Sequence, residues 1–310
     1  MKPIENSITR TNLAISLFRK DIAVILSATN TDLEERIEKS QVHLWHIDKW
    51  SSMNIQMSCV AVVTWATKVL MSCYLSHDGI VFFNDGSKDI LVEPIDGSDD
   101  GPSDIVQMKS IKYIENTLIV VGMARLVYKK TLPDGKWIRI DKGLFVPRAE
   151  RTNAVGLNDV ISDGNGALLA VGYKGEIWQM NSNGIWALEN SPCNIYLSSI
   201  AKQPDKDEFT IVGLKGTIIK GNPKKGWTLL NINTKSDFWS VVYFQNKIFV
   251  ASDSGIYEIE NDNVRIVNFN CNKPVTTRFL NSCTDSIWSV GDSHIFSSID
   301  GINWVEISNP

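Results

Sequence analysis

One phrase of about ten residues recurs along this chain at nearly constant spacing. An apolar run ends in a small residue, a short polar turn follows, and a second apolar run begins. The four clearest copies centre on Gly172, Gly213, Ser252 and Gly291, so the steps between them are 41, 39 and 39 residues. A period of roughly 40 residues holding about four short strands is typical of a β-propeller blade. The repeat therefore predicts an all-β chain built from copies of one small antiparallel sheet.

The unit at residues 155–190 shows how one copy divides into strands. Its apolar segments predict strands at residues 158–162, 167–171, 176–180 and 185–188. The turn after the first strand, Asp-Gly-Asn-Gly, contains dipeptides that favour tight β-hairpins. We therefore expect each unit to be a four-stranded antiparallel sheet.

Weaker copies of the phrase occur upstream, around residues 118–128, 70–83 and 23–28. We predict a single β-propeller domain of seven four-stranded blades, because stacked and closed sheets bury faces that one sheet cannot bury alone. The approximate blades are residues 12–47, 56–95, 108–141, 155–190, 196–231, 237–269 and 276–308. Six blades after an N-terminal extension is the alternative, because residues 32–39 have a helical composition.

Tryptophan recurs near the end of several units. The four residues at similar positions are Trp137, Trp186, Trp227 and Trp304. Large aromatic side chains at equivalent positions of a repeat usually fill a shared core. We expect them to fill the spaces between blades near the outer rim rather than to bind a partner.

One turn carries a known family phrase. The segment Ser298-Ile-Asp300-Gly301-Ile-Asn303-Trp304 resembles the S-x-D-G-x-x-W hairpin of Asp-box (BNR) repeats, and residues 132–137 and 182–186 are degraded copies. The wider repeat is similar to photosystem-assembly-factor-like propellers. The resemblance implies a propeller whose aspartate caps a turn and whose tryptophan tucks beneath it. It implies no catalytic activity, because these motifs are structural.

Composition narrows the functional classes. The formal net charge of −4 argues against a broad basic face for nucleic acid. Five cysteines occur without close pairing, which favours a reducing compartment. The first residues lack the apolar core of a signal peptide. We therefore expect a cytoplasmic protein that binds neither nucleic acid nor membrane.

Motifs for catalysis, cofactors or metals are absent from the sequence. His43 and His46 form the one close histidine pair, but residues three apart on a strand face opposite sides. We predict no enzyme activity, no cofactor and no metal. An enzyme with a site in the central channel would need inward polar groups, and Glu115, Asp159 and Arg278 are the candidates.

A partner is expected on the face that carries the turns between second and third strands and the connections between blades. The predicted contact residues in these turns are Arg125, Tyr173, Lys174, Lys215, Asp253 and Asp292. Phe145 and Arg148 lie in a long basic connection, residues 142–151, and long connections inside compact folds are often functional. The acidic loop 96–104 is interpreted as solvated, with partner binding or calcium binding as alternatives.

We predict a non-enzymatic protein-binding propeller. The most concrete hypothesis is an immunity or inhibitor protein that binds and blocks a toxin or enzyme, because the chain is a small acidic propeller without catalytic motifs. An acidic inhibitor would suit a basic toxin that acts on nucleic acids or nucleotides. The alternatives are an assembly scaffold or chaperone-like propeller, and a hydrolase or lyase with its site in the central channel.

Overall fold

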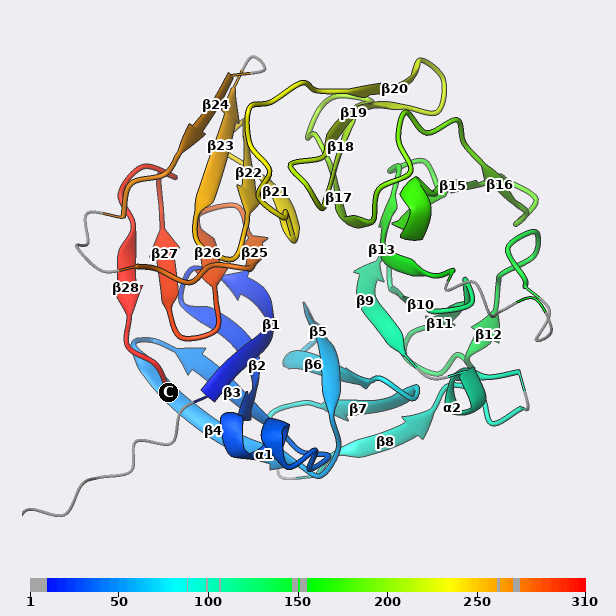
Figure 1. The fold of residues 1–310 in the computed structure, drawn as a ribbon. Coiled ribbons are helices and arrows are strands. Elements are labelled where there is room, and N and C mark those ends of the chain that lie inside the picture. The colour runs from blue at the N-terminus through cyan, green and yellow to red at the C-terminus, as the bar shows by residue number, and fades with distance from the viewer. Residues whose placement is uncertain are drawn as a thin grey trace, which may run out of the picture.

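The structure is a computed structural model, and it describes residues 10–87, 89–98, 100–105, 107–146, 150, 155–260, 263–269 and 274–310. Seven four-stranded antiparallel sheets are arranged around a central axis, as Figure 1 shows. The first strands of neighbouring sheets contact one another, so they are the innermost strands. The predicted seven-bladed all-β propeller is confirmed.

Each sheet uses four strands that follow one another in the sequence. Blades 1 to 3 comprise β1 (Arg10–Arg19), β2 (Ile22–Thr29), β3 (Ser40–His46), β4 (Lys49–Ile55); β5 (Cys59–Ala66), β6 (Leu70–Ser76), β7 (Ile80–Asn84), β8 (Leu91–Pro94); and β9 (Met108–Ile114), β10 (Thr117–Gly122), β11 (Val127–Thr131), β12 (Ile138–Arg139). Blades 4 and 5 comprise β13 (Leu157–Ser162), β14 (Leu168–Gly172), β15 (Ile177–Met180), β16 (Trp186–Leu188); and β17 (Leu197–Lys202), β18 (Phe209–Gly213), β19 (Ile218–Asn222), β20 (Gly226–Leu229). Blades 6 and 7 comprise β21 (Ser240–Phe244), β22 (Lys247–Ala251), β23 (Ile256–Glu260), β24 (Asn263–Ile266); and β25 (Phe279–Ser282), β26 (Ile287–Val290), β27 (Ile295–Ser298), β28 (Val305–Ile307).

Blade 1 differs from its predicted boundaries. Its sheet spans residues 10–55, so β4 lies wholly beyond the predicted end at residue 47. The segment of helical composition, residues 32–39, yields only a short helix, α1 (Asn30–Glu34), in the connection from β2 to β3. No residue of α1 is buried, and a helix without a packed face is marginal in water. The alternative of six blades after an extension is therefore wrong.

The core is divided among the seven junctions between blades. Each junction holds one cluster of buried apolar side chains from two neighbouring sheets. Trp186 lies between blades 3 and 4, Trp227 between blades 4 and 5, and Trp304 between blades 6 and 7. Trp137 packs, partly buried, against the junction of blades 2 and 3. The predicted structural role of these tryptophans is confirmed.

The ring closes where blade 7 meets blade 1, and Figure 1 shows β28 and the C-terminus beside the first blade. The Asn12 side-chain amide donates to the carbonyl of Gly291 at 2.9 Å. The indole rings of Trp45 and Trp288 meet edge to face, with centroids 6.1 Å apart. The closing junction therefore combines a buried apolar cluster with side-chain-to-backbone hydrogen bonds.

Within the described part of the chain, no helix has the length and apolar character needed to cross a bilayer. The two α-helices, α1 and α2 (Pro102–Ile105), span five and four residues.

Candidate partner-binding face

The antiparallel order of each sheet determines which turns share a face. The chain passes from the second to the third strand, and from one blade to the next, at the same end of every sheet. We call this side the loop face and the opposite side the hairpin face. The predicted contact residues Arg125, Tyr173, Lys174, Lys215, Asp253 and Asp292 all lie in loop-face turns. Whether they bind a partner stays a prediction.

The loop-face turns of blades 4 and 5 have the same backbone geometry. Lys174 and Lys215 have positive φ angles of 56° and 57°, and each is followed by a glycine with positive φ. A Cβ on Gly175 would lie 2.0 Å from the Cys193 carbonyl oxygen. Glycine is therefore required beside the next connection. The turn leaves both lysine side chains exposed.

Arg125 forms an ion pair within the chain. Its guanidinium donates to both carboxylate oxygens of Glu176, at 2.8 and 2.5 Å, and lies 5.1 Å from the centre of the Trp178 ring. The Trp178 indole N–H also donates to Glu176, at 2.9 Å. These contacts join blade 3 to blade 4, and both charged side chains are largely buried. The Arg125 guanidinium is thus engaged in a contact between blades.

Tyr173 belongs to an aromatic pair on the loop face. Its ring meets that of Tyr196 edge to face, with centroids 4.8 Å apart. The Tyr196 hydroxyl donates to the Asn158 side-chain oxygen at 3.0 Å. Burial raises the pKa of the Tyr196 hydroxyl to about 12, so the phenol stays neutral at physiological pH. The pair offers a rigid aromatic surface with few rotatable bonds.

The long connection after blade 3 is anchored by its apolar residues. Leu144 is fully buried in the junction of blades 3 and 4, whereas Phe145 keeps 46% of its surface exposed. The Arg139 guanidinium lies 4.9 Å from the centre of the Phe145 ring and donates to Asp141. Arg148 lies outside the described residues. Phe145 thus stands at the surface of the loop face, as a contact residue would.

The acidic loop has structural contacts on one of its carboxylates. Asp96 accepts hydrogen bonds from the Tyr128 hydroxyl and from the backbone N–H of Ser98, both at 2.9 Å. Among the described residues, no group of three or more histidine, cysteine or acidic side chains is placed to hold a metal ion. Asp99, another residue of this loop, lies outside the described residues.

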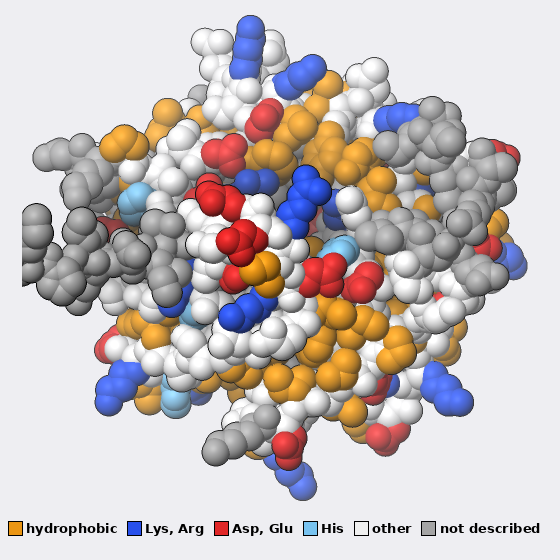
Figure 2. Space-filling view, turned by 60° about the horizontal axis from the view of Figure 1, so that its bottom comes forward, with side chains coloured by type: hydrophobic (Ala, Val, Ile, Leu, Met, Phe, Trp, Pro, Cys, Tyr) orange, Lys and Arg blue, Asp and Glu red, His pale blue; other side chains and the backbone are white. Residues whose placement is uncertain are grey.

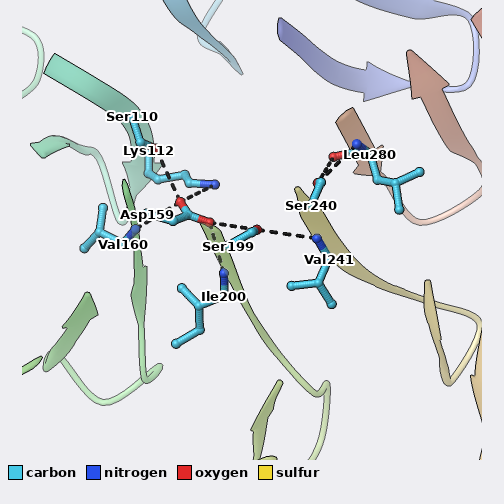
Figure 3. Close-up of polar contacts among 9 residues, drawn as sticks. All are labelled: Ser110, Lys112, Asp159, Val160, Ser199, Ile200, Ser240, Val241 and Leu280. Atoms are coloured by element: carbon cyan, nitrogen blue, oxygen red, sulfur yellow. Dashed lines mark hydrogen bonds and ion pairs between the residues drawn. The ribbon is translucent and has the colours of Figure 1, made fainter. Parts of the chain in front are cut away.

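Three inner-strand side chains form a repeated seam around the axis, which Figure 3 shows. Asp159 accepts the backbone N–H of Ile200 at 3.2 Å, Ser199 accepts that of Val241 at 3.4 Å, and Ser240 accepts that of Leu280 at 3.1 Å. In each case a first strand accepts from the first strand of the next blade. The steps of 40 and 41 residues between these side chains match the repeat. Sequence reasoning missed the seam, although this spacing could have revealed it.

The seam changes the interpretation of the inward candidates for catalysis. The buried Asp159 carboxylate also contacts Lys112 at 3.0 Å, Ser110 at 3.3 Å and Ser199 at 3.0 Å. Its hydrogen-bonding capacity is used in joining three blades. Glu115 is not inward: it lies exposed in the turn between β9 and β10 on the hairpin face, because β9 ends at Ile114. The structure therefore does not assemble Glu115 with Asp159.

The histidine pair is separated in the way that strand geometry requires. His43 is fully buried and bonds Ser27 and Ser52 through its two ring nitrogens, both at 2.7 Å, whereas His46 is exposed. Burial lowers the pKa of the His43 imidazole to about 4. His43 is therefore a neutral, hydrogen-bonded residue of the core of blade 1.

The side of the ring that carries α1 has a mixed surface. Figure 2 shows acidic, basic and apolar side chains interspersed there, without one continuous basic area. The exposed residues of α1 and the turn after it include Glu34, Glu35 and Glu38 as well as Arg36. This distribution offers no extended track for a phosphate backbone.

The chain is similar to Immune protein Tsi7 of Pseudomonas aeruginosa, with 26% identity over 293 residues that cover 93% of this chain and 94% of the relative. It also resembles solved propellers in fold. A structure of YCF48 bound to D1 peptide has a TM-score of 0.69 at 12% identity, covering 98% of this chain and 93% of that one. The WD40 propeller domain of Doa1 has a TM-score of 0.69 at 11% identity, covering 93% and 92%. No model of a known protein family matches the sequence. The similarity in sequence to Immune protein Tsi7 thus extends along nearly the whole of both chains.

Proposed function

We propose that this chain is a non-enzymatic immunity-type protein that acts in the cytoplasm by binding a toxin or enzyme and blocking it. The observation that carries the proposal is the similarity to Immune protein Tsi7, which extends over nearly the full length of both chains. The propeller supplies a rigid ring whose loop face varies in charge and shape from blade to blade. Such a face suits specific protein recognition.

The contacts of the inner strands support a binding role over catalysis. Asp159, the buried carboxylate among the inward candidates, is held by hydrogen bonds and an ion pair to neighbouring blades. A catalytic acid or base needs a free face toward a substrate proton. A carboxylate committed to joining blades fits a structural role instead.

We also propose that the turn Ser298–Trp304 is a hairpin of the Asp-box type. The Asp300 carboxylate accepts the backbone N–H groups of Ile302 and Asn303, at 2.8 and 2.7 Å, and Ser298 accepts that of Gly301 at 2.9 Å. These contacts have the capping pattern that the family phrase implies. They support common descent of the repeat and bear on fold rather than on activity.

The proposal is tested by neutralisation. The gene beside this one supplies the first candidate toxin, and copurification of the native protein with mass spectrometry supplies the second. Each candidate is expressed alone and together with this chain in a host that it harms. Restored growth and a stoichiometric complex are the expected results. A partner whose harmful activity is unchanged by this chain in both cases would contradict the immunity role.

An assembly scaffold is the second candidate function. The fold is shared with YCF48, which has been solved bound to a peptide. A scaffold would raise the yield or assembly of its partner without lowering the partner's activity. The activity of the purified partner, measured with and without this chain, separates the two functions.

A further inference from the structure

One position of the repeat carries two unusual residues at the loop-face end of the inner strands. Ser198, Trp239 and Arg278 are spaced by 41 and 39 residues, so they occupy equivalent places in blades 5, 6 and 7. In blade 5 the small Ser198 hydroxyl bonds the carbonyl of Phe238 at 2.6 Å. In blades 6 and 7 the same place holds a tryptophan and an arginine. The mouth of the axis is therefore aromatic and cationic on this side.

The Arg278 guanidinium is held flat by aromatic rings. Its central carbon lies 4.4 Å from the centre of the Trp239 ring and 5.8 Å from that of Phe279. The side chain keeps 38% of its surface exposed. Contact with aromatic faces favours one plane for a guanidinium, and its N–H donors lie in that plane.

The acidic contact of Arg278 is incomplete. Among the described residues, the carboxylate within ion-pair distance is that of Asp253, at 3.9 Å, and it is 62% exposed. That separation exceeds a hydrogen bond, and exposed pairs of this kind contribute little. The guanidinium thus lies against its rings, while no close carboxylate acceptor for its donor edge is found in the part of the chain that the structure describes.

Arg125 combines the same stacking on a tryptophan with a bidentate ion pair to a carboxylate. Arg125 also stacks on an indole ring, that of Trp178, and its donors meet both oxygens of Glu176. In that case the chain supplies the carboxylate from the neighbouring blade. Arg278 on Trp239 has the same arginine-on-tryptophan geometry without the bidentate carboxylate.

The surroundings of Arg278 favour a protein partner with an acidic segment. Tyr196, in the connection that leads into blade 5, lies on the same loop face. Tyr173 extends the aromatic surface, and the turns of blades 4 and 5 add the exposed Lys174 and Lys215 on the same face. Tryptophan, tyrosine and arginine are the residue types that dominate interface hot spots.

We propose that Arg278, stacked on Trp239 on the loop face that also carries Tyr196 and Tyr173, is the receptor for a carboxylate side chain on a projecting segment of the toxin. The carboxylate takes the bidentate position that Glu176 takes on Arg125, and the aromatic rings cover the apolar part of the same segment. The inference rests on the proposed immunity function. This chain is acidic as a whole, which favours a basic toxin. The proposed site is cationic, so at this point the toxin would present an acidic segment.

The test measures binding of the toxin identified by the neutralisation experiment, by titration calorimetry with purified proteins. We expect Arg278→Met to weaken binding by about 30-fold or more, the loss typical of a hot-spot residue. Arg278→Lys should also weaken binding, by about tenfold, because the charge is kept and the planar fork is lost. The matched control is Arg19→Met, since Arg19 is an exposed arginine paired with Asp21 on the hairpin face. Equal unfolding temperatures of the variants would establish that the ring is intact, and Arg278→Lys serves if Arg278→Met unfolds.

Binding of the toxin to Arg278→Met within twofold of wild type would overturn the proposal and leave the immunity function standing. Failure of the wild-type chain to bind or neutralise would overturn the immunity function itself.

Discussion

Buried polar residues of this propeller serve as connections between blades. Asp159 receives contacts from blades 3 and 5, and His43 links two serines within blade 1. Both residues are of types that occur in active sites, and the sequence alone could not separate the two uses. What decides between them is the set of atoms within hydrogen-bond distance. Here those atoms belong to neighbouring strands.

Removal of the Asp159 carboxylate should destabilise the ring. Asp159→Ala leaves the backbone N–H of Ile200 and the Lys112 ammonium without their acceptor, so we expect a loss of about 2–4 kcal/mol in the free energy of unfolding. Asp159→Asn, which keeps an acceptor oxygen, should lose less. Urea unfolding measures both values. A change below about 0.5 kcal/mol in Asp159→Ala, the usual range for surface sites, would contradict a structural role.

The buried histidine should make stability depend on pH. The folded chain holds the His43 pKa at about 4 through burial, whereas an unfolded histidine titrates near pH 6.5. Below pH 6.5 the unfolded chain therefore binds a proton that the folded chain does not, and stability falls with acidification until about pH 4. The slope should reach up to about 1.4 kcal/mol per pH unit. Urea unfolding between pH 7 and 4.5 should show a smaller slope for His43→Gln, which lacks this group, and identical slopes would rule the assignment out.

At the scale of strands and turns, the repeat predicted most of what the structure contains. The four predicted strands of residues 155–190 lie within one residue of β13 to β16. The fourth strand of blade 1 was missed, because residues 49–55 alternate weakly and stay mostly exposed. The ion pair of Arg125 with Glu176 could not be predicted, since it joins residues 51 positions apart across two sheets.

Two glycines of blade 4, one in a loop-face turn and one in a hairpin-face turn, permit a direct comparison. Gly175 and Gly184 have similar positive φ angles of 74° and 70°, but a Cβ at Gly175 would strike the Cys193 carbonyl while one at Gly184 meets nothing within 4 Å. Gly184→Ala should cost about 1 kcal/mol for its backbone conformation alone. Gly175→Ala should cost about 2 kcal/mol more, because the next connection must move. Urea unfolding of both variants checks the difference, and equal costs would show that the connection yields freely.

The whole molecule is held by junctions of similar construction, and the junction of blades 7 and 1 closes the ring. Periodicity in the sequence predicted this closure, because copies of one sheet leave two unburied faces until the last meets the first. Partner recognition was less predictable. The sequence identified the turns on the loop face. It did not point to Trp239 and Arg278 as a contact site, because that proposal depends on the stacking of their side chains in the folded structure.

Weakening the closing junction should affect the entire ring. Trp288 is almost fully buried among residues of blades 7 and 1. Trp288→Ala should lower the free energy of unfolding by about 3–5 kcal/mol, as large-to-small core substitutions do. Unfolding should stay a single transition that coincides by circular dichroism and fluorescence, because each blade needs two neighbours. Separate transitions by the two probes would indicate blades that unfold independently.

Every sheet of this protein is completed by a continuous stretch of chain, with no strand borrowed from a distant part of the sequence. During synthesis, each blade can therefore form as soon as its own residues are available, and it can pack at once on the blade made before it. The contacts across the junction of blades 7 and 1, such as those between Asn12 and Gly291 and between Trp45 and Trp288, must await the last blade. The slow, long-range step of assembly is thus confined to the junction of blades 7 and 1, which is expected to form last.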